Sequence, residues 1–125
     1  TTPKAMDIAI NKAKTSGIGV VTINNSRHLG MASYHALKAL EHNMIGVCVS
    51  SCPPQVVPTF GTEPLLGTNP IAIAAPTKNK PPYVFDAAMS SVAANKIGIA
   101  KRLGKKLLHQ INFNDIKKSI MEKIC

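Results

Sequence analysis

The sequence contains no tryptophan and few other aromatic residues, which limits what its positive charge can bind. Aromatic residues make up 4% of the 125 residues, and the formal net charge is +9. Seven of the fifteen Lys and Arg residues lie in residues 101–125, so the excess is concentrated at one end. Proteins that bind single-stranded nucleic acid stack bases on aromatic side chains, which are scarce here. We therefore favour a solvated basic tail over a nucleic-acid-binding module.

Cysteines and long apolar runs are also scarce. Cys48, Cys52 and Cys125 are an odd number without a disulfide framework, which suits a reducing compartment. No second pair of ligands accompanies Cys48 and Cys52, so we expect no metal site, and we place Cys48 in the core. No apolar run is long enough to span a bilayer, and the N-terminus has no signal-peptide layout. We expect a cytoplasmic, globular domain without membrane contact.

Several common catalytic signatures are missing as well. The chain has no P-loop and no paired-carboxylate motif, and its six acidic residues leave few candidates for carboxylate catalysis. Gly17 and Gly19 do not form a dinucleotide fingerprint, because they precede the apolar run and a third glycine is missing. Nucleotide binding by the common glycine-rich loops is therefore excluded.

The pattern of the first fifty residues predicts alternating helices and strands. Pro3 suits the first turn of a helix that ends at Gly17. The β-branched run 18–23 predicts a buried strand, residues 31–42 a second helix and residues 45–50 a second strand. Strand, helix and strand in this order predict a right-handed parallel βαβ unit. On the second helix we expect His35 and His42 to be ordinary surface or interface residues.

The rest of the chain predicts a long excursion followed by a hairpin. Four prolines before Gly67 exclude a helix in residues 51–70, and long ordered loops are often functional. Residues 71–75 and 83–85 predict two strands joined by a polar turn, which would make the sheet mixed. A helix should then reach about Arg102, and Asn114 should begin a last amphipathic helix. The predicted fold class is α/β, a mixed sheet with flanking helices.

His28 is the first candidate for chemistry. It follows the run 18–23 and precedes the second helix, and ligands commonly bind at such strand ends in open α/β sheets. Gly30 lets a backbone or a ligand approach closely. A surface histidine on a connecting loop is an equally simple interpretation. Asp86 at a later strand end and the turn Gly67–Pro70 complete a weak set of three signals.

The order and spacing of these signals resemble the malate/L-lactate dehydrogenase family, which binds its cofactor without a Rossmann fold. The resemblance covers about residues 3–104. The matching motifs are Gly17-Ile-Gly-Val-Val, Asn25-Ser-Arg-His28-Leu-Gly30, Met44-Ile-Gly46, Val57-Pro58, Gly67-Thr-Asn-Pro-Ile-Ala-Ile-Ala74, Asp86-x-Ala88-x-Ser90 and Lys96-Ile97.

The resemblance implies a hydride transfer between NAD or NADP and C2 of a small 2-hydroxy or 2-oxo acid, such as malate or lactate. It implies that His28 is the general acid/base on the substrate oxygen, a task that suits an imidazole. It also implies a set of residues that line the cofactor: Cys52, Thr68, Asn69, Pro70, Asp86, Ala87, Ala88, Ser90 and Lys96.

The sequence lacks the family's upstream segment, which carries an arginine for the substrate carboxylate. An alternative is therefore a catalytically incomplete remnant or pseudoenzyme subunit that acts in assembly. We divide the chain into a cofactor-binding-like domain, residues 1–104, and a basic amphipathic tail, residues 105–125. The apolar stripe of the tail must be buried somewhere, because short isolated helices are marginal in water. We favour a homo-oligomer or contact with a partner chain over docking on the tail's own domain, and a solvated end is the remaining alternative.

Overall fold

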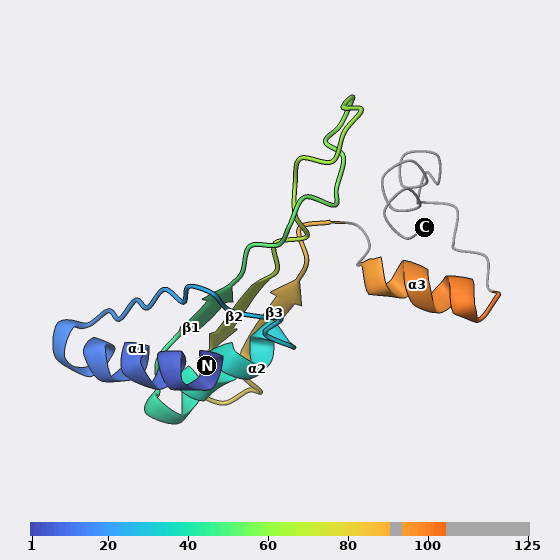
Figure 1. Cartoon of the computed structure of the whole chain (residues 1–125). Coiled ribbons are helices and arrows are strands. Elements are labelled where there is room, and N and C mark those ends of the chain that lie inside the picture. The colour runs from blue at the N-terminus through green and yellow to red at the C-terminus, as the bar shows by residue number, and fades with distance from the viewer. Residues whose placement is uncertain (91–93, 105–125) are drawn as a thin grey trace. The chain divides into compact units, whose positions relative to one another are not determined.

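The computed structural model describes residues 1–90 and 94–104, which belong to two compact units (Figure 1). The first unit comprises Thr1–Ser50 and Pro70–Ala87, and the second comprises Ser51–Asn69 and the chain from Ala88 onward. The amphipathic helix predicted from Asn114 lies outside the described residues. The α/β class, a sheet flanked by helices, is confirmed in the first unit.

Helix α1 (Thr2–Ser16) has the predicted bounds. Pro3 lies in its first turn, where a missing N–H costs nothing. Gly17 ends the helix in the left-handed conformation (φ 79°) and donates its N–H to the carbonyl of Ala13 at 2.8 Å. The helix packs against the next two helical elements rather than against the sheet, and Ile10 is its buried residue.

The strand predicted at residues 18–23 is not formed, and the parallel βαβ unit is therefore wrong. The segment is extended and keeps a two-residue alternation of exposure, with Ile18 and Val20 exposed and Val21 half-buried. It lies against α1 instead of a strand, since an added Cβ on Gly19 would come within 1.8 Å of the Ala9 carbonyl oxygen. Ladder hydrogen bonds require a neighbouring strand, and none of the described strands pairs with this segment.

The helix predicted at residues 31–42 is divided into α2 (Ala32–Leu37) and the 3₁₀ helix η1 (Lys38–His42). Asn43 ends η1 in the left-handed conformation (φ 55°). His42 is exposed as expected, but His35 is buried, with 5% of its surface exposed. The surface position assigned to His35 is thus wrong, because it shares the inward face of α2 with Ala32, Ala36 and Ala39.

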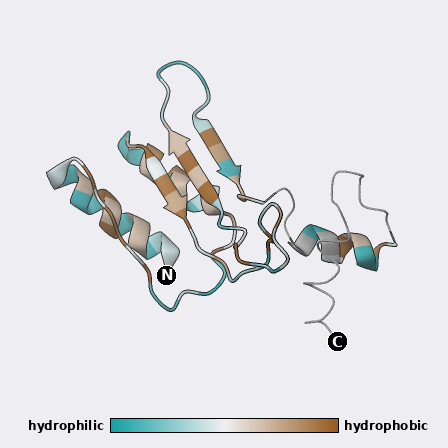
Figure 2. Ribbon diagram, turned by 90° about the horizontal axis from the view of Figure 1, so that it is seen from above, coloured by the Kyte–Doolittle hydropathy of each residue, from teal (hydrophilic) through white to brown (hydrophobic). Residues whose placement is uncertain are grey.

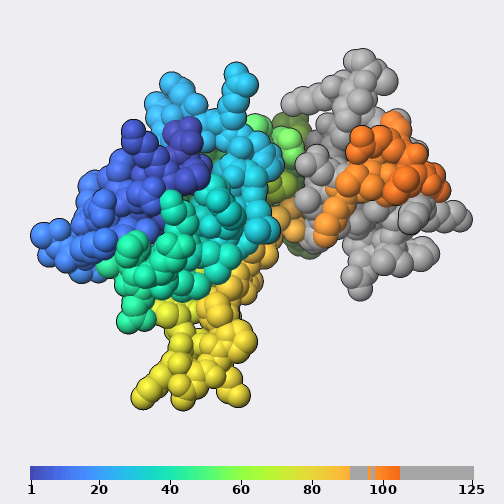
Figure 3. Space-filling view, turned by 90° about the horizontal axis from the view of Figure 1, so that it is seen from below, coloured from blue at the N-terminus to red at the C-terminus, as the bar shows by residue number. Residues whose placement is uncertain are grey.

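Three antiparallel strands form the sheet in the order β1–β2–β3: β1 (Gly46–Val49), β2 (Ile71–Ala75) and β3 (Tyr83–Ala87). The predicted hairpin of β2 and β3 is confirmed, and its turn (yellow) projects from the end of the sheet (Figure 3). The described strands contain no parallel pair, because the expected partner segment lies against α1.

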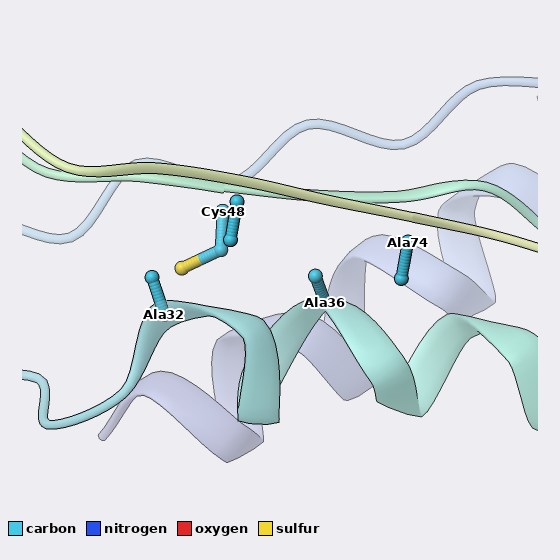
Figure 4. Close-up of a cluster of buried hydrophobic side chains, with 5 residues drawn as sticks. Ala32, Ala36, Cys48 and Ala74 are labelled. Atoms are coloured by element: carbon cyan, nitrogen blue, oxygen red, sulfur yellow. The ribbon is translucent and has the colours of Figure 1, made fainter. Parts of the chain in front are cut away.

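The two faces of the sheet have different surroundings. One face packs on α2, and its buried cluster consists of small residues, which allow a close approach of helix and strands: Ala32, Ala36, Cys48, Ala72 and Ala74 (Figure 4). On the opposite face the apolar residues Val47, Ile73 and Phe85 lie in register on the three strands. Hydrophobic residues recur along the strands of the sheet (Figure 2). Val47 and Phe85 are 54% and 42% exposed, so this face is largely uncovered in the described chain.

The second unit contains the predicted long excursion and helix α3 (Ala94–Arg102), which confirms a helix reaching Arg102. An isolated antiparallel bridge between Val56 and Leu66 joins the two sides of the excursion. Within residues 1–90 and 94–104, no helix is both long and apolar enough to cross a lipid bilayer.

Candidate functional site

His28 lies on the exposed loop that leads from the extended segment 18–23 into α2. Its Nδ1 atom accepts a hydrogen bond of 3.0 Å from the N–H of Gly30. Gly30 has a φ of 81°, a conformation that a residue with a Cβ rarely adopts. Because Nδ1 is an acceptor in this contact, the neutral ring carries its hydrogen on Nε2. Nε2 makes no hydrogen bond within the described chain, and so it can face a substrate oxygen.

Helix α2 anchors this loop from the other side. The Nε2–H of buried His35 contacts the carbonyl of Leu29 at 2.8 Å, directly beside His28 in the sequence. Leu29 also packs against the buried cluster of the first unit. The backbone around His28 is therefore fixed both by a hydrogen bond and by apolar packing, although the imidazole of His28 itself is exposed.

Asp86 on β3 stabilises the start of α2. Its Oδ2 accepts a hydrogen bond of 2.8 Å from the backbone N–H of Ser33, which has no intrahelical partner in the first turn. A carboxylate at this position also interacts favourably with the helix dipole. The N-cap residue, Met31, provides no side-chain cap. Asp86 therefore caps α2, the helix that follows the His28 loop.

Cys48 faces Asp86 across the sheet, because both residues pair with Ala72 on the α2 side. Burial raises the pKa of the Cys48 thiol above its usual value of 9.0, and the nearby Asp86 carboxylate raises this pKa further. The folded chain therefore favours the neutral thiol. The contribution of the neutral Cys48 thiol to the free energy of unfolding is complete below pH 9. It is lost as the pH rises through the elevated pKa of the folded state.

We expect Cys48 to resist alkylation while Cys52, which is half-buried, reacts. A thiolate is the reactive form, and both burial and the raised pKa keep Cys48 out of that form at pH 8. Iodoacetamide treatment followed by peptide mass spectrometry measures the two sites separately, and denatured chain serves as the control in which both react. Equal labelling of the two cysteines in the folded chain would contradict the buried position of Cys48.

A second group of predicted residues meets in the turn Gly67–Pro70. The Asn69 side chain accepts the N–H of Cys52 on Oδ1 at 3.0 Å, and the Thr68 carbonyl accepts the N–H of Met89 at 2.7 Å. Gly67 permits the first contact, since an added Cβ would lie 2.3 Å from the Cys52 carbonyl oxygen. These bonds join the Cys52 segment, the turn and the segment of Ala88 and Ser90.

The donors at this turn fit an anionic cofactor. Oδ1 of Asn69 is held by Cys52, which orients the amide NH₂ of Asn69 and leaves its two hydrogens for a ligand. In the described part of the second unit, Glu63 is the single acidic residue, whereas Lys96, Lys101 and Arg102 are exposed cations on α3. Polar donors without a competing carboxylate suit the phosphates and the amide of a dinucleotide.

The predicted site residues thus form two sets, one in each unit. Pro70, Asp86 and Ala87 belong to the first unit together with His28, whereas Cys52, Thr68, Asn69, Ala88, Ser90 and Lys96 belong to the second. Lys96 lies in α3, and the described hydrogen bonds do not join it to the turn.

Sequence reasoning missed His35. Its helical spacing with Ala32, Ala36 and Ala39 was a usable signal, because these positions form one face of a helix.

In the described residues, no group of three or more His, Cys, Asp or Glu side chains is placed to hold a metal ion.

Comparison with known proteins identifies relatives that match most of the chain. The malate dehydrogenase of Pyrococcus abyssi is 49% identical over 104 residues, which are 83% of this chain and 28% of the relative. The (2R)-3-sulfolactate dehydrogenase (NADP(+)) of Chromohalobacter salexigens is 33% identical over 104 residues, 83% of this chain and 31% of the relative. The crystal structure of malate dehydrogenase from Entamoeba histolytica matches with a TM-score of 0.79 and 40% identity, covering 86% of this chain and 30% of that one.

The family model for malate/L-lactate dehydrogenase matches residues 1–115, beyond the expected end of the resemblance at residue 104. The chain therefore belongs to the malate/L-lactate dehydrogenase family. It spans less than a third of the length of the relatives described above.

Proposed function

We propose that the chain is the cofactor-binding part of an oxidoreductase that transfers a hydride between NAD or NADP and C2 of a small 2-hydroxy or 2-oxo acid, such as malate or lactate. The observation that carries the proposal is the His28 loop, which holds one ring nitrogen on the backbone and leaves the other open. The relatives, named as malate and sulfolactate dehydrogenases, support this class of substrate.

In this proposal His28 is the acid/base group for the C2 oxygen. The neutral ring donates Nε2–H to the oxygen of a 2-oxo acid and orients that carbonyl. Delivery of a full proton requires the imidazolium form, which carries hydrogens on both nitrogens. The contact from Gly30 must open in that form, because its N–H cannot donate to a protonated Nδ1. After this transfer the neutral ring keeps its hydrogen on Nδ1. In the oxidation direction the ring therefore starts in that Nδ1–H form, with the Gly30 contact open, and its bare Nε2 takes the proton of the substrate hydroxyl.

The bound nicotinamide would supply or accept the hydride at C2. Thr68, Asn69, Ala88 and Ser90, together with Cys52, are the residues that we propose to line it, with Pro70, Asp86, Ala87 and Lys96 completing the set. The carboxylate of Asp86 already accepts a hydrogen bond from the Ser33 N–H. We therefore propose that Asp86 also helps to hold the His28 loop in place, through the start of α2. One relative is named for NADP(+), and either nucleotide is compatible with the donors at the turn.

The uncovered apolar face of the sheet supports association, so we propose a homo-oligomer or a complex with a partner chain, in the cytoplasm.

Titration with NADH and with NADPH tests the proposal. Calorimetry on the folded chain should detect binding of at least one of them, because the donors at the turn of Thr68 and Asn69 are held in place by backbone contacts. The variant Asn69→Leu is the matched test, since it removes both the held acceptor and the free amide hydrogens. Absence of binding at millimolar cofactor by a folded chain would instead support a remnant that acts in assembly.

A further inference from the structure

His35 is a polar residue at a position where the fold otherwise uses alanine. It lies on the inward face of α2, with 5% of its surface exposed, between the buried residues Ala32 and Ala36. The neighbouring Tyr34 ring lies edge-on to it, with centroids 5.3 Å apart and an interplanar angle of 80°. The imidazole is therefore held in one orientation from within the helix.

The burial of His35 leaves one of its nitrogens without a partner. Nε2 lies 2.8 Å from the Leu29 carbonyl oxygen, and a carbonyl can only accept, so Nε2 carries the hydrogen of the neutral ring. Nδ1 is then a bare acceptor, and it makes no hydrogen bond to residues 1–90 or 94–104. A buried polar atom without a partner costs free energy, and an apolar side chain would avoid that cost. In the part of the chain that the structure describes, the contact with Leu29 is the one hydrogen bond of the imidazole.

The carbonyl held by His35 belongs to the residue between His28 and Gly30. The Leu29 carbonyl and the Gly30 N–H belong to one planar trans peptide group and point in opposite directions. Fixing the carbonyl therefore also fixes this N–H, which donates to Nδ1 of His28 at 3.0 Å. The orientation of the exposed imidazole thus depends on a buried one through a single residue of backbone.

We propose that His35 is a positioning residue for His28: the Nε2–H of His35 holds the Leu29 carbonyl, and the loop fixed in this way keeps the His28 ring in the tautomer that carries its hydrogen on Nε2. The functional meaning of this arrangement rests on the proposed role of His28 in hydride transfer. The arrangement itself can be measured in the chain without any turnover.

Apolar packing of Leu29 is the competing explanation for the order of the loop, because Leu29 also packs against the buried cluster. The two explanations differ in what they require of residue 35. Packing needs only a side chain of similar volume, whereas the proposal needs a donor directed at the Leu29 carbonyl.

Two substitutions separate these explanations in the full-length, isotope-labelled chain. His35→Phe keeps a ring of similar size and removes the donor, whereas His35→Gln keeps an N–H that can reach the carbonyl. His42→Phe is the control, because it makes the same change at an exposed position, six residues after the buried Ala36. The readouts are the amide exchange rate of Gly30 and the ¹⁵N shifts of the His28 ring, which distinguish the two neutral tautomers.

We expect His35→Phe to accelerate exchange of the Gly30 amide about fivefold, as for the loss of one ordinary hydrogen bond, and to mix the His28 tautomers. His35→Gln should restore the Nε2–H tautomer, and His42→Phe should change neither readout. An unaltered His28 spectrum in His35→Phe would overturn the proposal, as would a failure of glutamine to restore it.

The wild-type chain provides a second measurement in case His35→Phe does not fold. The side-chain Nε2–H of His35 and the backbone N–H of Gly30 should both be protected and should exchange together. Rapid exchange of the Gly30 N–H beside a protected His35 proton would overturn the proposal. None of these results depends on whether His28 takes part in hydride transfer. The proposed function is tested separately, by the activity of a His28 variant.

Discussion

Replacing His28 with asparagine should lower the rate of hydride transfer by about 10²–10⁴-fold, the contribution that a positioned general acid/base makes. The asparagine side chain can still accept the Gly30 N–H, but it has no nitrogen that gains and loses a proton near neutral pH. The melting temperature should hardly change, because His28 is exposed and its one described contact is to a neighbouring backbone N–H.

The rate is best measured in a complete subunit, since this chain spans less than a third of its relatives. A suitable host is the Pyrococcus abyssi malate dehydrogenase, in which the 104 matching residues are replaced by those of this chain. His42→Asn in the same chimera is the control, because it makes the same chemical change at another exposed position. A chimera that keeps its rate after His28→Asn would show that His28 is a surface histidine only.

Replacing Gly46 with alanine should destabilise the first unit by about 3 kcal/mol, at the upper end of the cost of overpacking. The added Cβ would lie 2.0 Å from the Ala36 carbonyl oxygen and 2.8 Å from its carbon. These are backbone atoms of α2, which cannot rotate away as a side chain can. The helix would have to move off the sheet, and the small-residue cluster would lose its close contacts. We expect a fall in melting temperature of more than about 10 °C.

Gly98→Ala is the matched control for this substitution. Among the described residues, and apart from the backbone of α3 itself, nothing lies within 4 Å of a Cβ added to Gly98. Alanine in a helix is favoured over glycine by about 0.5–1 kcal/mol. The same chemical change should therefore destabilise the chain at Gly46 and leave it unchanged or slightly more stable at Gly98. Similar melting temperatures for both variants would contradict the close packing of β1 on α2.

Local patterns predicted the elements whose signals are contained in their own residues. The end of α1 at Gly17 follows from a conformation that glycine adopts freely, and the bounds of β2 follow from an apolar run closed by Pro76. The run 18–23 has an equally strong strand signal and is extended as predicted. Its pairing could not be predicted, because that depends on which surface lies beside it, and here Gly19 faces α1.

In the candidate site, too, the sequence predicts the local features but not the contacts between distant residues. His28 was identified because its place between an apolar run and a helix is a local property. The partner of Asp86 could not be identified in this way, since its contact with Ser33 joins residues fifty-three positions apart. His35 was misplaced because its helical spacing with Ala32, Ala36 and Ala39, which describes the buried face, was not taken into account.

The separation of the first unit into two stretches of chain has a consequence for how it folds. Strands β2 and β3 are joined by a short turn, so their hairpin closes a small loop. Strand β1 can pair with β2 only after residues 51–69 have formed a much longer loop. At the base of this loop the N–H of Ser50 donates a hydrogen bond to the Pro70 carbonyl at 3.2 Å. Doubling such a loop costs only about 0.6 kcal/mol of closure entropy. Pairing of β1 should therefore follow closure of the hairpin, but a change in the length of the excursion should alter the folding rate only slightly, and the unit should tolerate insertions there.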